Sequence, residues 1–236
     1  MKLLLLSNST NLNEPYLEYC IAHINLFLGK EPLHILFIPY AAVTFSYNDY
    51  EQKVNEKFSE IGHRVISIHH SDDPRVSIAN ADAIIVGGGN TFQLLKKLQD
   101  LSVLKSLKEK VLKGTPYIGW SAGSNLACPS IATTNDMPIV ETTGLKSLDL
   151  IPFQINPHYS NFIQPGHGGE TRDQRIFEFL TANPSKTVVG LPEGCMLKFE
   201  NYRLQCIGDK KIKIFKANQQ PFELDGSDNL EFLLMN

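Results

Sequence analysis

Short apolar runs alternate with longer stretches of helical periodicity through the first two-thirds of the chain. The runs at residues 35–38 and 83–86 contain only apolar side chains, as is typical of strands covered on both faces. We expect strands at residues 3–7, 34–39, 64–69, 83–87 and 116–120, and helices at residues 16–28, 47–61, 74–81, 91–98 and 103–113. Strands separated by helices of this length predict βαβ units and a parallel sheet. The functional site of such a sheet should lie at the carboxyl ends of its strands.

The last third of the chain has a looser pattern. We expect a strand at residues 154–156, a helix at 172–180 and a strand at 186–191, followed by short β-like segments at 196–199, 203–207 and 211–215. These short segments favour β-hairpins over further crossovers. The sequence contains no internal repeat, low-complexity segment or linker, so we expect a single α/β domain over residues 1–236.

Composition argues against several classes of protein. With 236 residues, of which 42% are hydrophobic, the chain can bury a sizeable core. Its net charge of -3 provides no basic patch for a nucleic-acid partner. Four leucines follow Lys2, but polar residues begin at Ser7, too soon for a signal peptide, and no segment approaches the ~18 apolar residues of a membrane span. The four cysteines have no zinc-binding or redox spacing, so we expect buried, reduced thiols in a cytoplasmic protein.

The clearest local signal is the pentapeptide Gly119-Trp120-Ser121-Ala122-Gly123, which has the G-x-S-x-G pattern of a nucleophile elbow. A predicted strand leads into it, and the residues after it can start a helix. The glycines let the backbone turn sharply, and the helix start directs N–H groups at developing negative charge. The pattern predicts Ser121 as a nucleophile and the N–H of Ala122 as part of an oxyanion hole. The alternative is a turn of small residues in which Ser121 only caps the helix.

A second glycine-rich segment follows another predicted strand and consists of Gly87, Gly88, Gly89, Asn90 and Thr91. Exposed N–H groups in such a segment can bind an anion, but the spacing fits neither a phosphate loop nor a dinucleotide fingerprint. We interpret Gly88 or Gly89 as the other half of the oxyanion hole. A glycine turn dictated by packing is the alternative.

A nucleophilic serine needs a general base, and the base needs an acid that orients it. Of the seven histidines, His158 follows a predicted strand and can reach the carboxyl edge of the sheet. Glu193 also follows a predicted strand and fits the role of the acid, and Asp136 competes with it.

Together these motifs resemble the aspartyl dipeptidase (peptidase E) family of serine peptidases. The resemblance is carried by residues 87–92 (GGGNTF), 119–124 (GWSAGS), 156–158 (NPH) and 166–172 (GHGGETR), and by LLLLSNS near the N-terminus. It extends over essentially the whole chain. The resemblance implies a flavodoxin-like, doubly wound, mostly parallel sheet related to class I glutamine amidotransferases. It also implies a cytoplasmic serine dipeptidase that acts on dipeptides with an N-terminal aspartate (Asp-Xaa).

The resemblance also implies catalytic roles, by motif. It makes Ser121 the nucleophile and His158 the base, and it points to either Glu193 or Asp136 as the acid. We favour Glu193 as the partner of His158 and regard Asp136 as essential in another way, for instance toward the substrate. Glutamine amidotransferases, the nearest rival on this fold, use a cysteine at the elbow and a glutamate two residues after the histidine. Ser121 and Ser160 occupy those positions here, which argues against glutamine hydrolysis.

An enzyme that demands aspartate must pair the buried carboxylate with a cation. Candidate substrate-binding residues are His167, Glu170, Thr171, Arg172 and Arg175 in the glycine-rich segment, with Asn90 beside the other glycines. Arg172 is our choice for the aspartate carboxylate, because its planar guanidinium can bind both oxygens. An exposed arginine at the start of a helix is the alternative.

No cofactor and no metal site are expected, and a small peptide substrate is the partner that the sequence indicates. His69 and His70 stand near Asp72, but no further ligand set is visible, so we expect a solvated loop there. Two other functions stay open at this point. One is a cyanophycinase-like hydrolase of β-aspartyl peptides, and the other is a non-catalytic flavodoxin-like ligand-binding protein.

Overall fold

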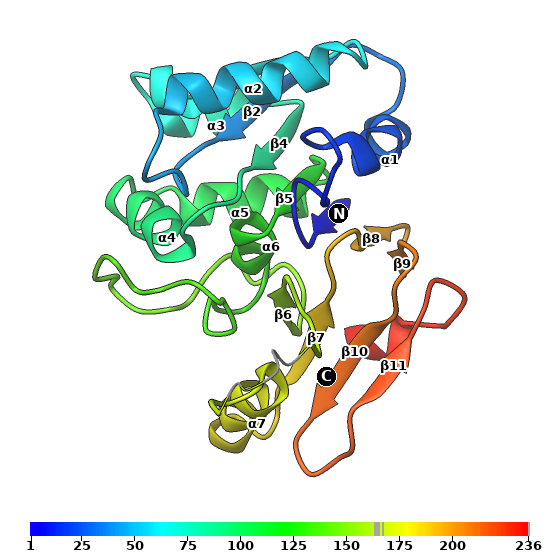
Figure 1. Cartoon of the computed structure of the whole chain (residues 1–236). Helices are drawn as coiled ribbons and strands as arrows, with labels where there is room; N and C mark the ends of the chain where they lie inside the picture. Colours follow the sequence, from blue (N-terminus) through cyan, green and yellow to red (C-terminus); the bar gives the residue numbers. More distant parts are fainter. Residues whose placement is uncertain (163–165, 167, 236) are drawn as a thin grey trace.

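The computed structural model of the chain, drawn as a ribbon in Figure 1, describes residues 1–162, 166 and 168–235. Within these residues, the larger of two sheets has seven strands in the order β3-β2-β4-β5-β1-β8-β9. Its parallel part consists of β1 (Leu3–Leu6), β2 (His34–Ile38), β3 (Arg64–Ser67), β4 (Ala83–Val86) and β5 (Tyr117–Trp120). A hairpin of β8 (Met196–Glu200) and β9 (Arg203–Ile207) continues the sheet beside β1 in the antiparallel direction.

Helices cover both faces of this sheet, which confirms the doubly wound α/β fold. The helices on one face are α1 (Glu18–Leu28) and α2 (Tyr47–Ser59), and those on the other are α3 (Pro74–Asn80), α4 (Thr91–Asp100), α5 (Leu104–Leu112) and α6 (Ala122–Ala127). The leucines of β1 alternate between the two cores: Leu4 and Leu6 pack toward α1 and α2, and Leu3 and Leu5 toward the other helices. A strand buried on both sides must be apolar at every position, as this one is.

The strand order explains where a site can form. The parallel strands of a flavodoxin-like sheet have the order 2-1-3-4-5, and the five parallel strands here have the order β3-β2-β4-β5-β1. Because β4, β5 and β1 are parallel neighbours, their carboxyl ends lie at the same edge of the sheet. The loops that follow these strands therefore come together at that edge.

The second sheet has the order β11-β10-β7-β6. Its parallel pair, β6 (Gln154–Pro157) and β7 (Thr187–Leu191), is connected through α7 (Arg172–Ala182), while β10 (Ile212–Lys216), which was expected, forms a hairpin with β11 (Phe222–Leu224), which was not. The Asn125 side chain of α6 donates a 2.7 Å hydrogen bond to the carbonyl of Ile155 in β6. The second sheet thus contacts α6, and it lies below the larger sheet in Figure 1.

Most expected boundaries agree with the structure to within two residues. The strand expected at residues 64–69 ends at Ser67, because its ladder with β2 ends at the Ser67–Phe37 pair, and a 3-10 turn, η1 (Ile68–His70), follows. The helix expected from residue 16 begins at Glu18, because Leu17 has the left-handed φ of 57°. A C-terminal 3-10 turn, η2 (Glu231–Leu234), was not expected. All four cysteines are buried and unpaired. Among the described residues, no helix combines the length and the apolar character that crossing a membrane requires.

Candidate active site

A cavity of about 710 Å³ opens at the carboxyl edge of the larger sheet. Its wall includes Thr10 after β1, Gly88 after β4, Ser121 after β5 and His158 after β6. These segments are distant in sequence, and the parallel strands bring them together. The position agrees with the expectation that ligands of open α/β sheets bind outside the carboxyl ends of the strands.

Ser121 occupies a sharp turn between β5 and α6. Its φ of 53° and ψ of -108° lie in a region that residues with a side chain rarely adopt, at a cost on the order of 1–3 kcal/mol. The turn also requires Gly123, because a Cβ there would lie 2.3 Å from the carbonyl oxygen of Val86. The Ser121 side chain makes no cap hydrogen bond to α6, so the reading of Ser121 as a helix cap loses its support. The strained turn instead presents the hydroxyl to the cavity, as in a nucleophile elbow.

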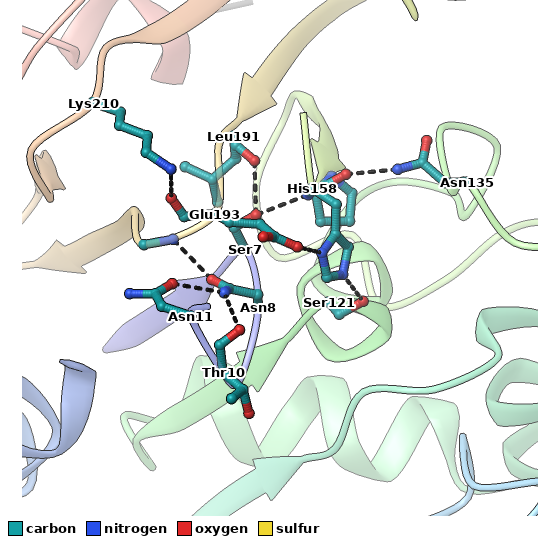
Figure 2. Close-up of polar contacts among 12 residues, drawn as sticks. Ser7, Asn8, Thr10, Asn11, Ser121, Asn135, His158, Leu191, Glu193 and Lys210 are labelled. Atoms are coloured by element: carbon teal, nitrogen blue, oxygen red, sulfur yellow. Dashed lines mark hydrogen bonds and ion pairs between the residues drawn. The ribbon is translucent and has the colours of Figure 1, made fainter. Parts of the chain in front are cut away.

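His158 links Ser121 to a carboxylate, as Figure 2 shows. Its Nε2 lies 2.8 Å from Ser121 Oγ, and its Nδ1 lies 2.7 Å from Glu193 Oε1. A carboxylate accepts hydrogen bonds only, so Nδ1 carries the proton and Nε2 is left to accept the serine hydroxyl proton. This is the arrangement that makes a serine nucleophilic. The distance to Glu193 lies within the hydrogen-bonding range expected for a base and its orienting acid.

Ser7, the first residue after β1, holds the backbone of His158. Its buried hydroxyl donates to the carbonyl of Leu191 and accepts from the N–H of His158, both at 2.8 Å. His158 itself has a φ of 52°, a left-handed conformation that is uncommon for a residue with a side chain. The serine therefore fixes an unusual backbone position, and it connects the larger sheet to both β6 and β7.

The neighbouring Asn8 holds the segment of the acid in the same way. Its Oδ1 accepts a 2.9 Å hydrogen bond from the N–H of Gly194, directly after Glu193. Its Nδ2 donates to the carbonyl of Thr10 and to Asn11 Oδ1, each at 2.9 Å. From the other side, Lys210 donates a 3.0 Å hydrogen bond to the Glu193 carbonyl. Sequence reasoning did not identify Ser7 or Asn8, although both lie in the N-terminal segment that carries part of the family resemblance.

Backbone N–H groups beside Ser121 are available to bind an anion. Within the described residues, the N–H groups of Gly88, Gly89 and Ala122 donate no hydrogen bond. Gly89 has a φ of 135°, and a Cβ on it would lie 2.2 Å from the carbonyl oxygen of Ala41, so no other residue fits. Because a Cβ on Gly88 would lie 3.2 Å from Ser121 Cβ, the glycine backbone runs directly beside the serine. This closeness is what an oxyanion hole requires.

The sequence model of peptidase family S51 matches residues 3–207 of the chain. The chain belongs to this family, and it is therefore a peptidase. It is 52% identical to "Peptidase E" of Nostoc sp. over 99% of this chain and 96% of the relative. It is 46% identical to "Peptidase E" of Salmonella typhimurium over 95% of this chain and 98% of the relative. These relatives confirm the resemblance on which the sequence interpretation rests.

Solved structures show the same fold. The chain is similar to a peptidase from an acI-B1 Actinobacterium, with a TM-score of 0.73 and 18% identity over 97% of this chain and 96% of that one. It is also similar to a putative peptidase E protein from Listeria monocytogenes, with a TM-score of 0.67 and 21% identity over 89% of this chain and 98% of that one.

In this family S51 chain, Asp136 lines the cavity but does not contact His158. Its Oδ2 accepts hydrogen bonds from the N–H of Thr91 at 2.7 Å, from the Thr91 hydroxyl at 2.5 Å and from the Thr134 hydroxyl at 3.0 Å. The carboxylate therefore lies at the N-terminus of α4, where the helix dipole favours a negative charge. Asn90 is the N-cap of the same helix, and its amide bonds to the Gln93 N–H and the Met137 carbonyl. Both ends of that amide are thus occupied, and Asn90 is not part of the cavity wall.

The candidate substrate-binding residues of the glycine-rich segment lie around the start of α7. Thr171 caps that helix, and Glu170 Oε2 lies 3.7 Å from Arg175 Nε on the surface. Arg172 contacts Asn135 Oδ1, beside Asp136, although it does not itself line the cavity. Burial, with a smaller contribution from Arg175, lowers the pKa of Arg172 from its usual value. His167 lies outside the described residues.

A potential metal-binding group lies away from this cavity. Glu51 of α2 joins His69 and His70 of η1, with ligand atoms all within 4.8 Å of one another. His70 Nε2 lies 2.6 Å from Glu51 Oε2. The sequence pattern indicated the two histidines but not Glu51, which approaches from a separate helix, and it paired them with Asp72, which is not in this group. The group does not line the cavity of Ser121 and His158.

Proposed function

We propose that this peptidase is a cytoplasmic serine dipeptidase that hydrolyses the α-peptide bond after an N-terminal aspartate, with Ser121, His158 and Glu193 as its catalytic triad. The observation that carries the proposal is the continuous hydrogen-bonded line from Glu193 through His158 to Ser121, with distances of 2.7 and 2.8 Å, at the wall of a cavity. The relatives named Peptidase E support the same assignment.

In the first step, Ser121 Oγ attacks the carbonyl carbon of the aspartyl residue. His158 Nε2 takes the hydroxyl proton, and Glu193 stabilises the imidazolium that forms. Negative charge moves to the carbonyl oxygen, where the N–H groups of Ala122 and of Gly88 or Gly89 stabilise it. When the intermediate collapses, the C–N bond breaks and His158 gives its proton to the leaving amine.

In the second step, water hydrolyses the aspartyl ester of Ser121. His158 takes a proton from the water, and the hydroxide equivalent attacks the ester carbonyl in the same oxyanion hole. Collapse of this intermediate returns the proton to Ser121 Oγ and releases aspartate. In each step His158 first accepts a proton and then donates it, so no other proton carrier is needed.

Recognition of aspartate is assigned to Arg172, with Asp136 nearby. The guanidinium contacts Asn135, the residue before Asp136 of the cavity wall. Because burial disfavours an unpaired charge, this guanidinium would be stabilised by a carboxylate partner. Asp136 at the start of α4 is suited to hold this side of the cavity in shape and to attract the free α-ammonium of a dipeptide. Because Ser7 connects β1 to both β6 and β7, we also propose that residues 1–236 form one domain.

The test is hydrolysis of Asp-Leu with release of free aspartate as the readout. Ser121→Ala should lower kcat by roughly 10⁴–10⁶, the loss that follows removal of a triad nucleophile. His158→Ala should cost about as much, and the double variant little more, because the two residues act as a unit. Retention of more than a tenth of the activity in Ser121→Ala would contradict the mechanism.

The same assay separates the other two functions. A cyanophycinase-like enzyme would cleave β-aspartyl-arginine and leave α-linked Asp-Leu intact, whereas the proposed enzyme does the reverse. A non-catalytic binding protein would not react with a fluorophosphonate. The proposed enzyme should be labelled on Ser121 and should lose the label in Ser121→Ala.

A further inference from the structure

Lys53 is the only lysine or arginine among the described residues that line the cavity. It lies on α2, and its Nζ lies 4.2 Å from the centre of the Tyr16 ring. No described carboxylate lies within ion-pair distance of it, although Asp49, one helical turn earlier, lines the same part of the cavity. A cation that faces a cavity without an ion-pair partner can accept a carboxylate from a ligand.

The next lysine of α2 shows what a structural role looks like on this helix. Lys57, one turn further on, forms ion pairs with Glu18 at 2.7 Å and Glu60 at 3.1 Å. It is outside the cavity wall. Lys57 therefore connects α2 to α1, and Lys53 is not needed for that connection.

Lys53 and Arg172 lie toward different faces of the larger sheet. Helix α2 packs on the α1 face, whereas Asp136 lies at the N-terminus of α4 on the opposite face, with Arg172 at the neighbouring Asn135. Ser121 directly follows β5, between the two faces. A dipeptide whose scissile bond lies at Ser121 can therefore place its two residues in these two directions.

If aspartate is held on the Asp136 side, the leaving residue points toward α2. The wall there is largely apolar, with Tyr16, Phe45 and Trp120, and Phe45 remains 48% exposed. Such a wall suits an apolar side chain of the leaving residue. The leaving residue of a dipeptide also carries a free C-terminal carboxylate, and Lys53 is the cation on that side. Asp49 would repel a second acidic group there.

We propose that Lys53 binds the C-terminal carboxylate of the leaving residue, so that the α2 end of the cavity selects dipeptides over longer or amidated peptides. This inference rests on the proposed function, because it takes the aspartyl half to lie on the other side of Ser121. A charge-assisted contact of this kind contributes roughly 10–100-fold to kcat/KM. It should appear mainly in KM, because the carboxylate is remote from the reacting carbonyl.

The experiment compares Asp-Leu with Asp-Leu amide, which differ only in the terminal carboxylate. The wild-type chain should prefer Asp-Leu by about 10–100-fold in kcat/KM. Lys53→Met should bring the ratio close to one by weakening hydrolysis of Asp-Leu and leaving that of the amide unchanged. Lys53→Arg should keep most of the preference, and Lys57→Met, the matched control on the same helix, should keep all of it. Thermal unfolding of each variant shows that it is folded.

Three results would overturn the inference. A wild-type enzyme that cleaves both compounds equally would leave Lys53 no terminal carboxylate to bind. An unchanged ratio in Lys53→Met would give the preference to another residue, and an equal loss on both compounds would place Lys53 on the aspartyl half. These results leave the proposed function intact. If the wild-type chain cleaves neither compound, the proposed function and the inference fall together.

Discussion

Ser7→Ala tests whether the geometry of His158, the proposed general base, is set from the larger sheet. The substitution removes a buried hydroxyl that serves two groups, the N–H of His158 and the carbonyl of Leu191. The His158 N–H would be left without a partner at a site where the serine has 0% exposure, whereas the Leu191 carbonyl would keep the N–H of Tyr159 as a donor at 3.1 Å. Leaving a buried polar group unpaired costs about 1–3 kcal/mol. We therefore expect a loss of roughly 1–3 kcal/mol in the free energy of unfolding, or roughly 2–12 °C in Tm for a chain of this size.

The effect on catalysis has a separate origin. Without Ser7, the left-handed backbone of His158 loses its hydrogen bond, and the imidazole can move relative to Ser121 and Glu193. A displacement on the order of 1 Å can reduce the rate about 100-fold. We expect kcat for Asp-Leu to fall by ~10–100-fold with little change in KM, because the cavity wall is otherwise intact.

Ser147→Ala is the matched control. Its hydroxyl lies 2.8 and 2.7 Å from the carbonyl oxygens of Leu126 and Cys128, to which it can donate, and it lies outside the cavity wall. Both carbonyls keep a backbone N–H donor, so the control should lose less stability than Ser7→Ala and should keep its kcat at a temperature where it is folded. If Ser7→Ala lowered Tm and left kcat unchanged, the role of Ser7 would be only structural and our reasoning about His158 would be refuted.

Three further predictions follow from the site. Glu193→Gln should lower kcat by ~10²–10⁴-fold, because a neutral amide cannot stabilise the imidazolium. Asp136→Asn should change KM as well as kcat. A larger loss of kcat in Asp136→Asn than in Glu193→Gln would make Asp136, and not Glu193, the acid of the triad. Arg172→Ala should lower kcat/KM by the equivalent of ~2–5 kcal/mol and should reduce the ratio of kcat/KM for Asp over Asn at the first position of the dipeptide. Arg172→Lys should also lower kcat/KM. If the Asp/Asn ratio did not change, Arg175 and His167 would be the next candidates. EDTA should leave hydrolysis intact, because Glu51, His69 and His70 lie outside the cavity; loss of activity that zinc restores, and that His70→Ala abolishes, would contradict this.

The sequence was informative where burial dictates residue type. The apolar runs of β2 and β4 predicted strands covered on both faces, because a doubly buried strand favours apolar residues at successive positions. In the second sheet, the strands expected at residues 154–156, 186–191 and 211–215 are present as β6, β7 and β10, but β11 was not expected. It has only three residues, and Phe222 and Glu223 are both exposed, so it is too short to show alternation or an apolar run.

The proposed nucleophile, Ser121, stands out in the sequence because its turn restricts several adjacent residues at once. The turn at Ser121 excludes a side chain at Gly123, and this restriction is visible as a motif. The choice between Glu193 and Asp136 rested on a weaker signal: Glu193 follows a predicted strand, and Asp136 does not. Lys53 gave no signal, because a lysine four residues after an aspartate is ordinary on any exposed helix. Only the fold shows that this turn of α2 faces a cavity.

The proposed catalytic residues come from two sheets, so the site depends on how the two sheets are aligned. Ser121 belongs to the larger sheet, while His158 and Glu193 follow β6 and β7 of the smaller one. A small shift between the sheets changes the distance from Ser121 Oγ to His158 Nε2 without disturbing either partner's own surroundings. Ser7 and Asn8, both directly after β1, bond to the segments that carry the histidine and the glutamate. The end of β1 therefore holds the proposed triad in alignment although it supplies none of its members, and substitutions there should reduce kcat before they reduce substrate binding.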